Sequence, residues 1–211
     1  YALSAQHSSH DPRLLSLTDY LQHASTSDVQ IDLDIPRTVR GHKSFHTRYG
    51  RGQCDLFGVL HAMSLMCAEC GYCQGMGPLA AMLLMHMPAS HALRVMRRMH
   101  DVYGFHELFR PGFPGLRAEF YVLSQLLDAL VPRMAQALAQ AGLAPSAYAT
   151  RWLLTVFHDA LPHATQLRVW DIFMACGRDA LLVVAVGLRR ALDMERYARR
   201  TPLFLGFRWA P

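Results

Sequence analysis

Residues 54–67, CDLFGVLHAMSLMC, show most clearly which secondary structure this chain forms. Apolar side chains recur there at steps of three and four residues, which places them on one face of an α-helix. The same period continues along the chain, and glycine or proline residues separate the periodic stretches. Pro132 should kink or interrupt one of the predicted helices, since proline cannot continue the helical hydrogen bonds. The sequence therefore predicts an all-α, multi-helix fold, with further helices near residues 79–86, 92–102, 116–134, 148–156, 167–174 and 181–192.

One stretch departs from this pattern. Residues 29–35, VQIDLDI, alternate apolar and polar side chains as a half-buried strand does. No other segment alternates in this way, and a lone strand would leave its backbone groups unpaired. Ile31 and Ile35 are also four residues apart, which fits one helix face, and Pro36 disfavours helical backbone at Ile35. We expect a helix or an extended segment that runs into a loop at Pro36.

The composition limits the class of protein. The chain has 211 residues, of which 52% are hydrophobic and 18% are charged, and this balance excludes a disordered chain. The net charge of +5 comes from scattered basic residues, so we expect no nucleic-acid partner. No apolar run is long enough to span a bilayer, so membrane association is expected to be peripheral at most. The chain shows no signal peptide, and its five cysteines form no disulfide framework, which favours a cytoplasmic location, with peripheral endomembrane association as the alternative.

Three cysteines, Cys67, Cys70 and Cys73, follow one another at a spacing of three. This spacing is typical of iron–sulfur and zinc sites, which need a fourth ligand. Cys176 lies far along the chain, and we found no second Cys-x-x-Cys or His-x-x-x-His pair. His61 could in principle complete a site, and so could His86. Because the second half of a metal site is missing, we expect the thiols to pack as small apolar groups, with no metal bound.

Two polar side chains have both a structural and a functional interpretation. Gln74 lies between Gly71 and Gly75, where it could simply cap a backbone carbonyl in a turn between helices. Arg37 follows Pro36, and a proline-braced loop presents an arginine outward at little entropic cost. The guanidinium of Arg37 carries a planar set of hydrogen-bond donors that suits phosphate oxygens. It could equally pair with Asp34 at the surface.

Five motifs occur in order along the chain and together resemble the TBC domain of Rab GTPase-activating proteins. The resemblance covers roughly residues 14–192. The segments that carry it are IDLDIPRT, GQCDLFGVLHAMS, GYCQGM, YATRWLLTVFHDALP and RVWDIFMACG. The family's Ile-x-x-Asp-x-x-Arg signature falls on Ile31, Asp34 and Arg37, and its Tyr-x-Gln motif falls on Tyr72, Cys73 and Gln74.

The resemblance implies an all-helical fold and a role for each signature residue. Arg37 would be an arginine finger and Gln74 a glutamine finger, both supplied in trans to a GTP-bound Rab-family GTPase. Asp34 is expected to anchor the Arg37 loop and Tyr72 to position the Gln74 loop, with Ile31 supporting the fingers. The chain would be a GTPase activator rather than an enzyme by itself. It would need no cofactor, because the partner carries Mg²⁺ and GTP.

The resemblance also divides the chain. Residues 1–13 lack the family's usual lead helix, residues 14–192 form the TBC domain, and residues 193–211 diverge from it. We expect a monomeric module that acts in vesicle trafficking. Two alternatives remain open: a catalytically silent TBC module that binds a GTPase or scaffold without activating it, and a metal- or redox-binding domain built on the cysteines.

The RVWD stretch has a structural interpretation. We expect Trp170 to be buried, with Arg168 and Asp171 forming a charge pair that ties helices together.

Overall fold

A computed structural model describes residues 16–199, with side chains described as far as residue 191. Within this range the chain forms helices, turns and loops and contains no strand, which confirms the all-α prediction. The chain divides into two compact units, Tyr1–Phe113 and Pro114–Pro211. The predicted N-terminal segment 1–13 and residues 200–211 of the predicted C-terminal segment lie outside the described residues. None of the described helices is long and apolar enough to cross a membrane.

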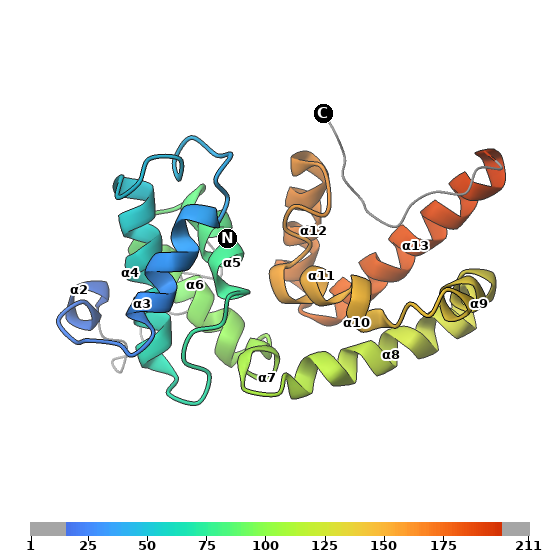
Figure 1. Ribbon diagram of the computed structural model, residues 1–211, viewed down its shortest axis with the longest axis horizontal. Coiled ribbons are helices and arrows are strands. Elements are labelled where there is room, and N and C mark those ends of the chain that lie inside the picture. The colour runs from blue at the N-terminus through green and yellow to red at the C-terminus, as the bar shows by residue number, and fades with distance from the viewer. Residues whose placement is uncertain (1–15, 200–211) are drawn as a thin grey trace. The chain divides into compact units, whose positions relative to one another are not determined.

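The first unit is built around α4, which packs against α2, α3, α5 and α6 (Figure 1). Seven of the nine residues of α5 are buried, including residues on every side of the helix, as expected for a helix at the centre of a core. The helices of this unit are α2 (Leu17–Tyr20), α3 (Asp28–Asp34), the 3₁₀ turn η1 (Ile35–Arg37), α4 (Arg51–Met66), α5 (Met76–Leu84), α6 (Ala89–Asp101) and α7 (Phe105–Phe109).

The alternating stretch at residues 29–35 is helical, so the helical alternative is the correct one. It forms α3, which packs on α4, and continues directly into η1, so the loop expected at Pro36 is a 3₁₀ turn and Ile35 is helical in spite of the proline that follows it. Ile31 and Ile35 are buried, whereas Val29 and Leu33 are 74% and 63% exposed. The i, i+4 pair therefore determines the conformation here. The alternation that resembled a strand arises because the exposed face of this helix also carries apolar residues.

In the second unit, α8 packs against α9, α10, α11 and α13, and α12 packs against α13. The predicted interruption at Pro132 is confirmed, because α8 ends at Leu130 and a new helix begins at Pro132. Proline suits such a first position because the missing N–H would have no intrahelical partner there. The helices are α8 (Pro114–Leu130), α9 (Pro132–Gln140), α10 (Pro145–Tyr148), α11 (Thr150–Thr155), α12 (His163–Cys176) and α13 (Asp179–Arg199).

The RVWD prediction is half correct. Trp170 is fully buried, as expected. Arg168 and Asp171 lie 3.5 Å apart, but both are more than half exposed and both belong to α12. Because i and i+3 residues are neighbours on one helix surface, this pair does not tie separate helices together.

Candidate functional site

Arg37 ends the short 3₁₀ turn η1, and its side chain is 60% exposed. Pro36 restricts the backbone of this turn. The amide of Thr38 closes it by donating to the carbonyls of Asp34, at 3.1 Å, and Ile35, at 3.0 Å. The Arg37 guanidinium donates through Nη2 to Oδ1 of Asp34, so its other nitrogens are not used in this ion pair. The turn therefore presents the arginine outward on a well-held backbone.

Asp34 is the centre of the site. It is buried, with 1% of its surface exposed. Besides Arg37, its Oδ1 accepts from Nε2 of Gln30 at 3.0 Å, and its Oδ2 accepts from the hydroxyl of Tyr72 at 2.9 Å. A buried carboxylate destabilises a protein unless it is paired and hydrogen-bonded, and three side-chain donors meet that requirement here. The bond to Tyr72 joins two segments that lie 38 residues apart in sequence.

Tyr72 lies in the loop that leads from α4 to α5, two residues before Gln74. Burial and the hydrogen bond to Asp34 raise the pKa of the Tyr72 phenol, so it remains a hydrogen-bond donor at neutral pH. The backbone after it forms a tight turn, in which the amide of Met76 donates to Cys73 at 2.8 Å and the amide of Gly77 donates to Gln74 at 3.3 Å. Gln74 itself is exposed at the start of this turn.

A second contact joins the two segments. A Cβ atom placed on Gly77 would lie 3.2 Å from Oγ1 and 3.4 Å from Cγ2 of Thr38. The first turn of α5 therefore packs closely against the residue that follows Arg37. Ile31, the first residue of the Ile-x-x-Asp-x-x-Arg signature, is fully buried on α3. The structure thus links the predicted Arg37 and Gln74 segments through Asp34, Tyr72 and the Gly77–Thr38 contact.

The Tyr72–Asp34 bond gives a testable prediction about stability. We expect Tyr72→Phe to lower the free energy of unfolding by about 1.5–3 kcal/mol, the range for a hydrogen bond to a charged group. Urea unfolding measures this loss, with Tyr121→Phe as the control, because Tyr121 is 67% exposed. An equal effect of the two substitutions would show that the bond does not hold the segments together.

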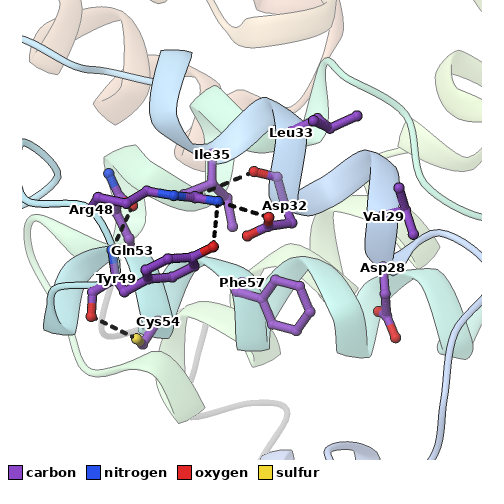
Figure 2. Close-up of a pocket in the computed structure, with 10 residues that line it drawn as sticks. All are labelled: Asp28, Val29, Asp32, Leu33, Ile35, Arg48, Tyr49, Gln53, Cys54 and Phe57. Carbon is purple, nitrogen blue, oxygen red and sulfur yellow. Dashed lines mark hydrogen bonds and ion pairs between the residues drawn. The ribbon is translucent and has the colours of Figure 1, made fainter.

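A separate groove lies between α3 and α4 (Figure 2). Its volume is about 550 Å³, and the exposed apolar side chains of α3, Val29 and Leu33, line it. At one side Arg48 donates through Nη2 to Asp32 at 2.7 Å and to the hydroxyl of Tyr49 at 2.9 Å. None of the five predicted site residues lines this groove. Arg37 and Gln74 are exposed side chains that lie outside this groove.

The structure corrects the description of the cysteines. Cys67 and Cys70 lie in the loop beyond α4, which ends at Met66. His61, one of the two histidines considered as a further ligand, does not lie with these thiols, because its ring nitrogens contact Asp28 and the carbonyl of Tyr20. Two other histidines, which the sequence analysis missed, are the ones that lie beside these thiols.

Comparison with known proteins gives the family. The sequence model of the Rab-GTPase-TBC domain matches residues 2–192, and the chain belongs to this family. A TBC domain-containing protein of Schizosaccharomyces pombe is 45% identical over 150 residues, which cover 71% of this chain and 36% of that protein. A Rab GTPase-activating protein of Caenorhabditis elegans is 32% identical over 169 residues, which cover 80% of this chain and 18% of that protein. The chain thus spans about a third or less of these relatives.

The fold agrees with this assignment. The crystal structure of the Chlamydomonas flagellar RabGAP TBC domain superposes with a TM-score of 0.71 at 20% identity, covering 92% of this chain and 61% of that one. The all-α, multi-helix TBC fold expected from the sequence is therefore confirmed. The domain boundaries at residues 13 and 192 stay predictions.

Proposed function

We propose that this chain accelerates GTP hydrolysis by a Rab-family small GTPase, with Arg37 and Gln74 supplied in trans to the nucleotide site of the partner. Membership of the Rab-GTPase-TBC family supports a role in Rab GTPase regulation, and so does the similarity to a relative named as a Rab GTPase-activating protein. The partner would be in its GTP-bound state, since only that state has a γ-phosphate to transfer. The partner would also carry the Mg²⁺ ion, and the chain would need no cofactor of its own.

The chemistry suits these two side chains. Transfer of a phosphoryl group to water requires a water molecule held in line with the breaking bond and positive charge near the phosphate oxygens. A glutamine carboxamide has both donors and an acceptor, so it can fix the protons of the water without adding net charge. An arginine supplies permanent positive charge and a planar set of donors where negative charge develops.

The observation that carries the proposal is the position of Asp34 between the two segments. This buried carboxylate contacts the guanidinium of Arg37 and the hydroxyl of Tyr72, so the turn carrying Arg37 and the loop carrying Gln74 share one anchor. Both proposed fingers are exposed, while the groups that hold their backbones are buried or half-buried. Such preorganisation reduces the entropy lost when the two side chains are placed against a phosphate.

The alternative of a catalytically silent TBC module is less well supported. A silent module needs neither an exposed arginine nor an exposed glutamine on anchored turns, and this chain has both. We therefore favour activation, by a monomeric module that acts in vesicle trafficking from the cytoplasm or from the surface of endomembranes.

The test is phosphate release from a panel of GTP-loaded Rab proteins, with and without the purified chain. We expect at least one Rab to hydrolyse GTP on the order of a thousandfold faster with the chain present, the scale of an arginine finger. If Rabs bind the chain but none is accelerated, the silent module is the correct description.

A further inference from the structure

Four potential metal ligands meet in the first unit. They are Cys67 and Cys70 from the loop after α4, His100 from the last turn of α6, and His106 from α7. One ligand atom from each of the four lies within 4.8 Å of all the others. Cys70 and His100 are buried, and Cys67 and His106 are partly buried. The sequence separates the cysteine pair from the histidine pair by about thirty residues, so only the fold brings them together.

Four of the six distances between these atoms match the edges of one coordination tetrahedron, and the other two are within 4.8 Å. In a zinc site with Zn–S of about 2.3 Å and Zn–N of about 2.0–2.1 Å, neighbouring nitrogens lie about 3.3 Å apart and a sulfur lies about 3.5 Å from a nitrogen. Here His100 Nε2 and His106 Nδ1 are 3.1 Å apart. Cys70 Sγ lies 3.5 Å from the first nitrogen and 3.4 Å from the second, and Cys67 Sγ lies 3.7 Å from the second.

The outer nitrogens of both imidazoles contact carboxylates. Nδ1 of His100 lies 2.7 Å from Oδ1 of Asp101, and Nε2 of His106 lies 3.3 Å from Oε2 of Glu69. Histidines that bind metals almost always donate their other N–H to a carboxylate, a carbonyl or water, which fixes the tautomer and aims the free nitrogen at the ion. In both residues, therefore, the nitrogen facing the thiols is the one left to accept a cation.

The cysteine loop has the shape that such a site needs. The amide of Cys70 donates to Sγ of Cys67 at 3.4 Å, and the amide of Gly71 donates to the carbonyl of Cys67 at 2.9 Å. Gly71 has a φ of +55°, a left-handed conformation that glycine adopts without strain. This turn places both thiols on the same side as the histidines.

We propose that Cys67, Cys70, His100 and His106 bind one zinc ion in a closed, structural Cys₂His₂ site. Two thiolates and two neutral imidazoles balance the charge of Zn²⁺ and complete its preferred tetrahedron, which leaves no open position for catalysis. A two-iron cluster is a poorer fit, because it would hold the cysteine and histidine pairs on different irons. This proposal replaces the expectation that the thiols only pack, which rested on the missing second pair of ligands.

A zinc ion at this site would hold the beginning of the loop between α4 and α5, which carries Gln74. Cys70 lies two residues before Tyr72 and four before Gln74, so the ion would hold one end of the segment whose other end enters α5. It would also join the ends of α4 and α6 to α7. The proposal does not depend on the proposed activity, because zinc binding is measured without any GTPase.

Metal analysis of the chain, purified without a histidine tag from zinc-supplemented cells, tests the proposal. We expect close to one zinc per chain after dialysis, and we expect Cys70→Ser and His106→Ala to lose it. Cys176→Ser and His91→Asn should keep it, because these exposed residues lie outside the cluster. Asp101→Asn should bind zinc about 10–100-fold more weakly, the usual effect of removing an outer partner.

Cobalt gives a second measurement that does not require the variants to fold. The wild-type protein stripped of metal and titrated with Co²⁺ alone should develop the visible absorption of a tetrahedral thiolate complex, and one equivalent of zinc should remove it. Chelation should lower the melting temperature, and zinc alone should restore it. A wild-type protein that neither retains zinc nor gives this spectrum would overturn the proposal, and so would stoichiometric iron with sulfide.

Discussion

Replacing Arg37 by alanine is expected to slow activator-stimulated hydrolysis of Rab-bound GTP by roughly a thousandfold or more. An arginine finger contributes on this scale because its charge lies where negative charge grows on the phosphate oxygens in the transition state. Single-turnover phosphate release with saturating activator measures the loss directly. Binding of the GTP-loaded Rab should change far less, since the interaction strengthens in the transition state rather than in the ground state.

Two variants control for other effects of this change. Arg37→Lys keeps a positive charge beside Asp34, so the buried carboxylate retains an ionic partner, but it lacks the planar fork of donors. We expect it to fold as the wild type and still lose most of the acceleration. Arg40→Ala removes another exposed arginine three residues further along and should keep near-normal activity. Near-full activity of a folded Arg37→Lys protein would refute the assignment of Arg37 as the finger.

Replacing Gln74 by alanine is expected to lower the stimulated rate on the order of a hundredfold, because a water displaced by about an ångström from the line of attack reacts that much more slowly. Arg37 cannot take over this task, since a guanidinium has no acceptor for the protons of the water. The exposed Gln74 side chain contributes little to packing, so the melting temperature should stay close to that of the wild type. The exposed Gln22→Ala variant of the same unit is the matched control, and an equal loss in both would argue against a specific role for Gln74.

The helices were predictable because a period of three to four residues depends only on local sequence. The stretch at residues 29–35 was ambiguous for the same reason, since its exposed face carries Val29 and Leu33 and so imitates the alternation of a strand. Only the packing of α3 on α4 distinguishes the two. Val29 and Leu33 line the groove beside α3, and the periodicity of the sequence could not have predicted that groove.

The candidate site was predictable from its motifs, but its connections were not. The family signature predicted that Asp34 anchors the Arg37 loop and that Tyr72 positions the Gln74 loop, as two separate roles. The structure shows that they bond to each other at 2.9 Å, so one contact serves both segments. The close approach of Gly77 to Thr38 was also unpredictable, because it depends on how α5 meets η1 in space.

The cysteine–histidine cluster shows the limit of a search for local spacing. The cysteine pair has a familiar spacing, but His100 and His106 are six residues apart and belong to different helices. The sequence signal that could have found them is that both have acidic neighbours, Asp101 and Glu107, although such pairs are common on helix surfaces. Three-dimensional proximity was needed to separate them from the other histidines.

The proposed role of Gln74, to orient the attacking water in trans, is tested by a two-by-two comparison of hydrolysis rates. The wild-type chain and Gln74→Ala are each combined with an unmodified Rab and with a Rab whose own switch glutamine is replaced by alanine. In most GTPases that switch glutamine orients the water. We predict that the wild-type chain accelerates both forms of the Rab and that Gln74→Ala loses on the order of a hundredfold of that acceleration with either form. If loss of the Rab glutamine abolishes the acceleration while loss of Gln74 does not, the GTPase orients its own water and the proposed mechanism is wrong.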